Sequence, residues 1–434
     1  MTPIPGIIYP PTLDFDYLVQ RPQQLLKSIS ELGVTVYFLN HPAYHHGFFQ
    51  AIERYNQHFF LFHHTEPSYP AATRPVVYYS NPTQVDIIGG YNPGLIVFDS
   101  LDEPVEEFSS WQPYYHRAVA SADLVLAASD KLYTRAQAIN PNTYLLPNGC
   151  DYDYFNQARS NQFVPPDLPE LKRAVIGYLG AVASWCDLEL LDQVAQVFSD
   201  CSLLIIGPLY NVRNIPLRPN IHWLGYKAYE DLIYYASYFD VGIIPFKKSD
   251  MTAAVNPIKM WEYLAMGIPV VTTALPETQK YSKELYYSSE RRDFINNIRR
   301  ALKQENWENC ERRMTLAREN SWMARARQML EAIQEGLRAK AIPGGETLPI
   351  PVTAIPYRRK NWFYQGEQVR FRGPTKKYVV PGPKENIREM AISVPTPVLS
   401  GSGRETRHLS ISGQHPKTFR YKNKKQYGPG ECSC

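Results

Sequence analysis

The first 150 residues alternate short apolar runs with polar or amphipathic stretches. The runs are rich in Val, Ile and Tyr, which is typical of strands that are buried on both faces of a parallel sheet. A helix is predicted from about Gln20, with Pro22 near its start and Gly33 at its end. The predicted strands are 6–9, 34–39, 61–64, 76–80, 95–100, 123–129 and 143–146.

The same pattern restarts after a proline-rich link at 163–167. Strand–helix–strand alternation implies right-handed crossovers, so it predicts an α/β protein with two facing Rossmann-like, doubly wound domains. A charged helical stretch, 291–340, ends this part. The predicted strands are 174–179, 202–206, 221–224, 241–246 and 270–272, and the helical patterns between them are about 188–198, 229–238 and 258–265.

Helical periodicity disappears after Pro343-Gly344-Gly345. Proline, glycine and basic clusters recur from there on, and 377–380 is the one short strand candidate. This composition predicts a largely extended or disordered tail. The expected organisation is therefore a first domain at 1–160, a second domain with the final helices at 161–340, and a basic tail at 341–434.

Charge is divided unevenly along the chain. The formal net charge is +4, but residues 341–434 contain 16 Lys+Arg against 6 Glu, while residues 1–340 contain 30 basic and 36 acidic residues. A +10 tail on a −6 body suggests peripheral contact with an anionic membrane or wall polymer. Nucleic-acid binding ranks last, because the tail has no folded module and no patterned aromatics.

The termini and cysteines indicate the compartment. The N-terminus lacks a basic segment followed by an apolar one, and no run of about 18 apolar residues exists. Six cysteines show no C-x-x-C pair and no zinc spacing, which suits reduced thiols. We expect a cytoplasmic protein, with the inner face of the cell membrane as its site of peripheral contact.

A glycine turn follows the first strand of the second domain, at Gly177–Trp185. In α/β sheets, ligands bind beyond the carboxyl ends of strands, and glycine lets backbone amides approach a diphosphate. Gly180 and Ser184 are therefore candidate binding residues, ahead of a helix near Asp187. The alternative is a turn that only packs strand against helix, and the G-x-G-x-x-G fingerprint is absent.

A second candidate is the helix that begins after Asn256-Pro257. Lys259 and Glu262 are three residues apart and share one helical face. The lysine suits a phosphate and the glutamate suits sugar hydroxyls, whereas the simpler interpretation is a solvated ion pair.

The block 256–271 resembles the nucleotide-sugar-binding segment of GT-B glycosyltransferases of the group-1/family-4 type, whose helix ends in E-A-x-A-x-G-x-P-V. The resemblance implies that the first domain binds the acceptor, that the second domain binds the nucleotide sugar, and that Glu262 binds the nucleotide ribose. It covers about residues 6–335. Gln20–Gln24 and Phe98–Glu103 are similar to a subgroup of cell-wall and surface-polysaccharide transferases, including the teichuronic-acid type. Further similar segments are 122–129, 146–151, 204–208 with Gly207, 221–226 with Gly225 and Tyr226, and 240–245.

Two departures from that family concern the donor. Its E-x7-E pair requires a glutamate where this chain has Ala254, and the Arg and Lys that follow its glycine turn are missing. We therefore expect Lys259 and the Gly180 backbone to hold the diphosphate, with Asn256 near the sugar. A non-catalytic relative of the family remains the open alternative.

Asp99, Asp102 and Glu103 follow a predicted strand on the acceptor side. A carboxylate there suits a general base or an acceptor-orienting group, and the alternative is an acidic cap on a helix start. Asp102 is the catalytic candidate, together with Lys259. If the resemblance extends to retention of configuration, the leaving phosphate takes the proton and no protein base is required.

Metal signatures are weak in this sequence. Asp14-Phe15-Asp16 and Asp151-Tyr152-Asp153 match the D-x-D of the other glycosyltransferase fold, but two domains are predicted here and the second match lies in the linker. The pairs His45-His46 and His63-His64 lack ligand spacing. No metal and no cofactor are therefore expected.

The function predicted from these features is metal-independent, retaining transfer of a sugar from a UDP- or GDP-type donor to a glycan or lipid-linked acceptor, in cell-wall or surface-polysaccharide synthesis. Charge stabilisation of the leaving diphosphate by Lys259 replaces a metal ion. The alternative is a non-catalytic GT-B-fold scaffold, or a surface- or spore-coat-associated protein, that binds anionic polymer through its tail.

Overall fold

The computed structural model describes residues 4–40, 50–172, 174–212, 214–304, 306–340 and 354–356. The predicted tail 341–434 lies outside these ranges apart from 354–356, and so do the strand candidate 377–380 and His45-His46. Among the helices of the described ranges, none is long and apolar enough to cross a membrane.

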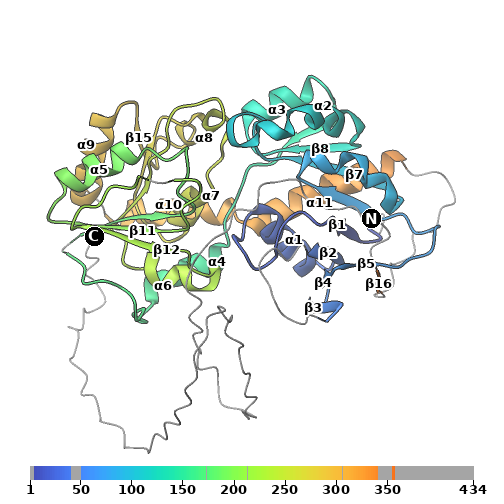
Figure 1. Ribbon diagram of the computed structural model, residues 1–434, viewed down its shortest axis with the longest axis horizontal. Helices are drawn as coiled ribbons and strands as arrows, with labels where there is room; N and C mark the ends of the chain where they lie inside the picture. The colour runs from blue at the N-terminus through green and yellow to red at the C-terminus, as the bar shows by residue number, and fades with distance from the viewer. Residues whose placement is uncertain are drawn as a thin grey trace, which may run out of the picture. The chain divides into compact units, whose positions relative to one another are not determined.

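The first sheet has eight strands in the order β3-β4-β2-β1-β6-β7-β8-β9 (Figure 1). All neighbours are parallel except the edge pair β3–β4. We call this sheet with the helices packed on it the first half. Its elements are β1 (Ile7–Tyr9), α1 (Arg21–Glu31), β2 (Val36–Asn40), β3 (Ile52–Asn56), β4 (Phe59–His63), β6 (Val76–Tyr79), η1 (Pro82–Asp86), η2 (Ile88–Tyr91), β7 (Leu95–Ser100), η3 (Glu106–Trp111), α2 (Gln112–Ser121), β8 (Leu124–Ala127), α3 (Asp130–Gln137) and β9 (Thr143–Leu145).

The second sheet has six parallel strands in the order β12-β11-β10-β13-β14-β15. We call it, with its helices, the second half. Its elements are α4 (Tyr152–Asn156), η4 (Gln157–Ser160), β10 (Val175–Leu179), α5 (Leu188–Val197), β11 (Ser202–Ile206), β12 (Ile221–Gly225), η5 (Tyr229–Asp231), α6 (Leu232–Ala236), β13 (Val241–Ile244), η6 (Thr252–Ala254), α7 (Ile258–Ala265), β14 (Val270–Thr273), α8 (Pro276–Gln279), β15 (Tyr286–Ser288), α9 (Arg291–Gln304) and α10 (Trp307–Glu319).

These two sheets confirm the predicted fold class. In each sheet the strand order reverses beside the first strand, between β1 and β6 and between β10 and β13. Ligands of doubly wound sheets bind at such switch points, beyond the carboxyl ends of the strands. The second switch point is therefore where the glycine turn after β10 and the helix α7 after β13 are expected to meet.

Several elements differ from the sequence prediction. Two strands were not predicted: the edge strand β3, whose three central residues are all exposed and which lacks an apolar run, and β15, which is short and half-buried. The predicted helix 229–238 is divided into η5 and α6. The charged stretch 291–340 forms three helices, α9, α10 and α11 (Trp322–Lys340). A small antiparallel pair, β5 (Thr65–Pro67) with β16 (Ala354–Pro356), was also not predicted.

Helix α11 packs on the first half, although it follows the second half in sequence. Trp322, Met329 and Ile333 of α11 are buried in one cluster with Ile7 and Leu25, beside α1 (Figure 1). Helix α4 comes directly after the first half in sequence, but its Phe155 belongs to the core of the second half. The chain therefore passes between the halves twice, and the boundaries predicted at 160 and 340 remain predictions.

The two crossing segments touch at Gly149. A Cβ at Gly149 would lie 2.5 Å from the backbone oxygen of Asn320, a distance that Cβ atoms do not adopt. The backbones of Cys150 and Ser321 pair as an isolated parallel β-bridge, and the Trp322 amide donates to the Cys150 carbonyl at 2.9 Å. Glycine is needed here because the two backbones are in direct contact.

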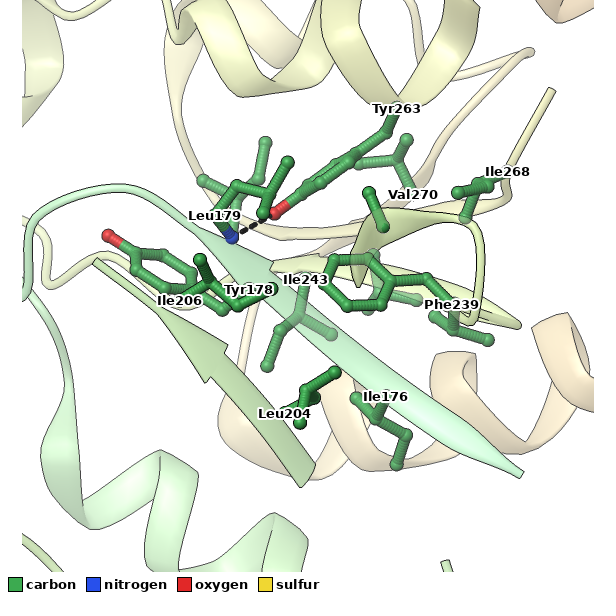
Figure 2. Packing of buried hydrophobic residues seen from close by; sticks show 14 of the residues in the cluster. Ile176, Tyr178, Leu179, Leu204, Ile206, Phe239, Ile243, Tyr263, Ile268 and Val270 are labelled. Atoms are coloured by element: carbon green, nitrogen blue, oxygen red, sulfur yellow. Dashed lines mark hydrogen bonds between the residues drawn. The ribbon is translucent and has the colours of Figure 1, made fainter. Parts of the chain in front are cut away.

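Helix α7 is fixed to the second sheet by Tyr263. Its ring lies against Gly242, where a Cβ would be 2.6 Å from a ring carbon, and its hydroxyl accepts a hydrogen bond from the Leu179 amide at 2.7 Å (Figure 2). Gly177 plays a similar packing role beneath the ring of Phe239. Helix α7 is thereby held against the carboxyl end of β10.

Candidate active site

Three glycines end neighbouring strands of the second sheet, and their backbones interlock. Gly180, Gly207 and Gly225 have φ values of +122°, +150° and +66°. The Gly180 amide donates to Ile206 and the Gly207 amide to Gly225, both at 2.8 Å. A Cβ at Gly207 would lie 2.0 Å from the Gly180 carbonyl oxygen. The conformations and the close approach both require glycine, so this part of the predicted site is a compact backbone platform.

The Gly180 amide is already paired, which corrects the expectation that it holds a diphosphate. The Val182 amide is also paired, with the Pro208 carbonyl at 2.9 Å. In the described chain no hydrogen bond uses the amides of Ala181, Ala183 or Ser184. These three amides, rather than that of Gly180, are the donors that the turn leaves for an anion.

The start of α5 is likewise occupied. The Asp187 carboxylate accepts from the Leu190 amide at 3.0 Å and pairs with Arg291. Because a carboxylate already caps this helix, its N-terminus adds little to anion binding.

Lys259 lies against the glycine turn without a partner. A Cβ at Gly180 would be 3.0 Å from its Cε and 3.3 Å from its Nζ, and the ammonium lies 5.3 Å and 4.7 Å from the ring centroids of Tyr178 and Phe246. Burial lowers the pKa of Lys259, while the Cys186 thiol and the Glu262 carboxyl oppose the shift. No acceptor among the described residues bonds to this ammonium. The site therefore offers a cation to an incoming anion.

Glu262 lies one turn further along α7 and is 9% exposed. Burial raises the pKa of Glu262 to about 7, and the nearby Lys259 ammonium opposes this shift. Its carboxyl group makes no hydrogen bond within the described ranges. A buried, unpaired carboxyl group suits hydrogen bonds from ligand hydroxyls.

Tyr229 is a neighbour of Glu262 that the sequence did not single out. Its hydroxyl is buried without a hydrogen-bond partner, and its ring stacks on Tyr154 at 5.0 Å. Burial raises the pKa of Tyr229, and the Glu262 charge adds to the shift, so the two groups are close. Tyr229 comes four residues after Gly225 beyond a strand end, which was the available signal.

The other predicted binding residues are engaged elsewhere. The Asn256 amide donates to Glu277 at 2.9 Å and accepts from the Trp261 indole at 3.2 Å. Ser184 Oγ donates to the Glu107 carboxylate. Tyr226 is 38% exposed, and its hydroxyl donates to the Asp16 carbonyl at 3.3 Å. Asn256, Ser184 and Tyr226 therefore have hydrogen-bond partners, whereas the Lys259 ammonium and the Glu262 carboxyl have none among the described residues.

The three acidic residues at and beyond the carboxyl end of β7 have different surroundings. Asp99 is fully buried and bonds to Arg21 and Tyr78, and Glu103 pairs with Arg135. Asp102 has no hydrogen bond or ion pair within the described residues. Burial, with the Asp99 charge as the second cause, raises the pKa of Asp102 to about 7. Asp102 is therefore the acid of this cluster that is free to act on a ligand.

Ala254 lies in apolar surroundings. It is 1% exposed and packs with Ala127, Ala128 and Leu132 of the first half. The turn that contains it is held by Glu106, which accepts from Ser249 Oγ at 3.0 Å and from the Met251 amide at 3.2 Å. The position where the resembling family has a glutamate is thus an apolar contact in this chain.

The D-x-D and histidine motifs have local partners. The Asp16 amide bonds to the Asp14 carboxylate at 3.2 Å, and Asp151 caps α4 by accepting from Tyr154 at 3.2 Å. His63 lies 3.3 Å from both Asn40 and Glu53. Within the part of the chain that the structure describes, no three His, Cys, Asp or Glu side chains are grouped as metal ligands.

Comparisons with known proteins match the part of the chain that contains the glycine turn and α7. Residues 173–304 match the family described as "Glycosyl transferases group 1". A putative teichuronic acid biosynthesis glycosyltransferase, TuaH of Bacillus subtilis (strain 168), is 28% identical over 231 residues, which are 50% of this chain and 57% of that relative. The match thus spans little more than half of the relative's length.

Solved structures show the fold. HepE of Anabaena, in complex with UDP and glucose, superposes with a TM-score of 0.55 at 13% identity, covering 76% of this chain and 99% of that one. The α,α-trehalose 6-phosphate synthase of Burkholderia multivorans superposes with a TM-score of 0.56 at 9% identity, covering 79% and 100%. The chain therefore has the GT-B fold.

Proposed function

We propose that the protein transfers a sugar from a UDP- or GDP-type nucleotide sugar to a hydroxyl group of a glycan or lipid-linked acceptor, in cell-wall or surface-polysaccharide synthesis. The observation that supports this most directly is the unpaired Lys259 ammonium against the glycine turn, with the unpaired Glu262 carboxyl one turn away. A cation beside free amides suits a diphosphate, and a carboxylate suits ribose hydroxyls. The name of the Bacillus relative supports the class of polymer.

The chemistry proposed for this site is a displacement at the anomeric carbon of the donor. The acceptor oxygen bonds to that carbon while the bond to the phosphate oxygen breaks, and the departing diphosphate keeps the electron pair. Lys259 and the amides of Ala181 and Ala183 stabilise the developing charge. In the retaining course that we propose, the acceptor proton passes to the departing phosphate oxygen and Asp102 orients the acceptor hydroxyl.

Metal independence belongs to the same proposal. Lys259 supplies the positive charge that a metal ion supplies in other transferases. Turnover should continue in EDTA, and proton NMR of the first product formed should show the anomeric configuration of the donor. Loss of turnover in EDTA with recovery on Mg²⁺ or Mn²⁺, or an inverted product, would contradict these two parts.

The donor is tested first by isothermal calorimetry with UDP-, GDP- and dTDP-glucose. Wild-type protein should bind one of them, and Glu262→Gln should weaken that binding by roughly tenfold, because it removes a charged acceptor. Glu290→Gln, which changes an exposed glutamate, is the control and should bind like wild type. Absence of binding to every nucleotide sugar and to the free nucleotides would reject the proposal.

The tail is proposed to hold the protein at an anionic membrane or wall polymer. Removal of 345–434 should leave donor affinity unchanged and should weaken sedimentation with anionic vesicles, more so at low salt, because the interaction is electrostatic. Equal sedimentation of the full-length and shortened proteins would refute this part.

The alternative is a GT-B-fold scaffold without catalysis, and the apolar packing of Ala254 is the observation that favours it. Such a protein would release no nucleotide from any bound donor, even with membranes or wall polymer present. Release of free UDP or GDP above the rate without protein would exclude it.

A further inference from the structure

A row of polar groups connects the two halves through the segment 146–151, and its side chains are buried apart from that of Asn148, which is half-buried. It begins at Asp99, at the carboxyl end of β7. The Asp99 carboxylate accepts from Arg21 Nε at 2.8 Å, from Arg21 Nη2 at 3.0 Å and from the Tyr78 hydroxyl at 2.5 Å. Arg21 and Asp99 are 2% and 0% exposed, so water does not share these bonds. The guanidinium is therefore held in one orientation.

Arg21 also bonds to Asn148 in the crossing segment. Its Nη1 donates to the Leu146 carbonyl at 2.8 Å and to Asn148 Oδ1 at 3.1 Å. The other end of the same amide, Asn148 Nδ2, donates to the Asn256 carbonyl at 2.6 Å. One side chain in the crossing segment thus accepts from the first half and donates to the second.

The connection continues from Asn256 and returns to the first half. Asn256 Nδ2 donates to Glu277 Oε2 at 2.9 Å, and Glu277 Oε1 accepts from the Asp130 amide at 3.0 Å, at the start of α3. Asn256 and Glu277 are 3% and 2% exposed. Buried groups with all their partners in place define one geometry, because any shift leaves a polar group unpaired.

The ends of this row adjoin the unpaired groups of the candidate site. Asp102 comes three residues after Asp99, while Lys259 and Glu262 come three and six residues after Asn256. We infer that Asn148 is a positioning residue, which sets the placement of Asp102 in the first half relative to Lys259 and Glu262 in the second. The catalytic part of this inference rests on the proposed function.

Two asparagines that are more deeply buried than the half-buried Asn148 provide controls. Asn220 Nδ2 donates to three carbonyls of the second half at 3.0–3.1 Å, and Asn140 Nδ2 donates to Val119 and Ala122 of the first half at 2.9 and 2.8 Å. Each bonds within one half. An Asn→Asp change at these positions removes the same kind of donor without touching the connection between the halves.

The first experiment measures the placement itself. Spin labels at Ala120→Cys on α2 and Asn296→Cys on α9, both exposed positions, give a distance distribution by pulsed electron resonance. Cys432 and Cys434 are changed to Ser, and the four other cysteines are buried. Asn148→Asp keeps the acceptor for Arg21 and loses the bond to Asn256, so the distribution should become at least twofold broader or shift. Asn220→Asp and Asn140→Asp should match wild type.

The second experiment separates positioning from folding. The probe is UDP-glucose or GDP-glucose, whichever wild type binds, and nucleotide release is measured beside calorimetric affinity. Asn148→Asp should lower the rate constant about tenfold and change the donor Kd less than twofold, since the donor groups lie in the second half. Asn220→Asp should lower the melting temperature at least as much and keep the rate within twofold. Arg21→Lys, which keeps the charge and loses the forked geometry, should resemble Asn148→Asp.

An unchanged distance distribution for Asn148→Asp would overturn the inference. Equal rate losses in Asn148→Asp and Asn220→Asp would also overturn it, because a general loss of stability would then explain both. Failure of the wild type to bind a nucleotide sugar would instead reject the proposed function, and the labels would still decide whether Asn148 fixes the two halves.

Discussion

The two halves use their buried charges in opposite ways. In the first half, Asp99 and Glu103 are paired with arginines, and Asp102 is left over. In the second half, Lys259 and Glu262 lie on one helix face and neither has a direct partner among the described residues. Pairing makes a buried charge structural, whereas an unpaired buried charge is destabilising until a ligand compensates it. The comparison therefore supports our proposal that the donor binds in the second half.

The largest expected effect is on the free energy of unfolding, through the buried Arg21–Asp99 ion pair of the first half. Arg21→Met should lower the free energy of unfolding by about 3–5 kcal/mol, because it leaves the Asp99 charge buried without its partner. Arg117→Met is the matched control, since Arg117 makes the same forked contact with Asp86 at an exposed position and should change stability little. Urea unfolding monitored by fluorescence measures both. Similar losses in the two variants would show that burial does not set the value of the pair.

Lys259→Met should have the next largest effect, on donor affinity rather than on folding. Loss of a charge-assisted contact with the diphosphate should raise the donor Kd by roughly 10- to 100-fold, and removal of a half-buried cation that has no ion-pair partner should change stability little. Lys248→Met, which removes an exposed lysine bonded to the Ser289 carbonyl, is the control. Calorimetry and thermal unfolding give the two readouts. Unchanged affinity would move the diphosphate away from α7.

The pH dependence of binding sharpens the role of Glu262. Its pKa of about 7 means that the carboxyl is mostly protonated at pH 6 and mostly ionised at pH 8. A ribose hydroxyl donates to the ionised form, so affinity for the nucleotide sugar should be roughly tenfold weaker at pH 6 than at pH 8. Glu262→Gln should abolish most of this dependence. A wild-type Kd that does not vary over this range would contradict the assignment.

Two tyrosines of the second half provide the smallest and most local test. Tyr229→Phe removes a buried hydroxyl without a partner and should leave the free energy of unfolding unchanged or slightly higher. Tyr263→Phe removes the acceptor of the Leu179 amide and should cost about 1–3 kcal/mol. Chemical unfolding of both variants measures the difference. A larger loss in Tyr229→Phe would indicate that its hydroxyl has a partner in the free protein.

Some parts of the fold were predictable because local pattern and burial coincide. The strands β10 and β11 are apolar runs buried on both faces, and their predicted positions are confirmed. The edge strand β3 is mostly exposed and polar, so its sequence carries no burial signal. The place of α11 was not predictable either, because an apolar helix face does not state which sheet it covers.

In the candidate site, too, some features follow from local sequence pattern and others do not. The spacing of Lys259 and Glu262 on one helix face followed from the helical period, and their placement beside Gly180 required the parallel order of β10 and β13. Other features of the site depend on long-range hydrogen bonds. The Gly180 amide bonds to the Ile206 carbonyl, and Asn256 bonds to Glu277. Asp102 remains available because Asp99 and Glu103 pair with distant arginines. No local pattern encodes such a pairing, since each partner is distant in sequence.

The amino-acid sequence by itself determined the two-part α/β organisation, the glycine turns and the shared helix face of Lys259 and Glu262, because these depend on residue periodicity and on backbone conformations that favour glycine. Only the tertiary structure decided which charged groups remain unpaired. That outcome depends on burial and on partners that are far apart in the sequence, such as Arg21 and Asn148, which are separated by 127 residues. Desolvation in the folded protein then separates structural charges from those available to a ligand.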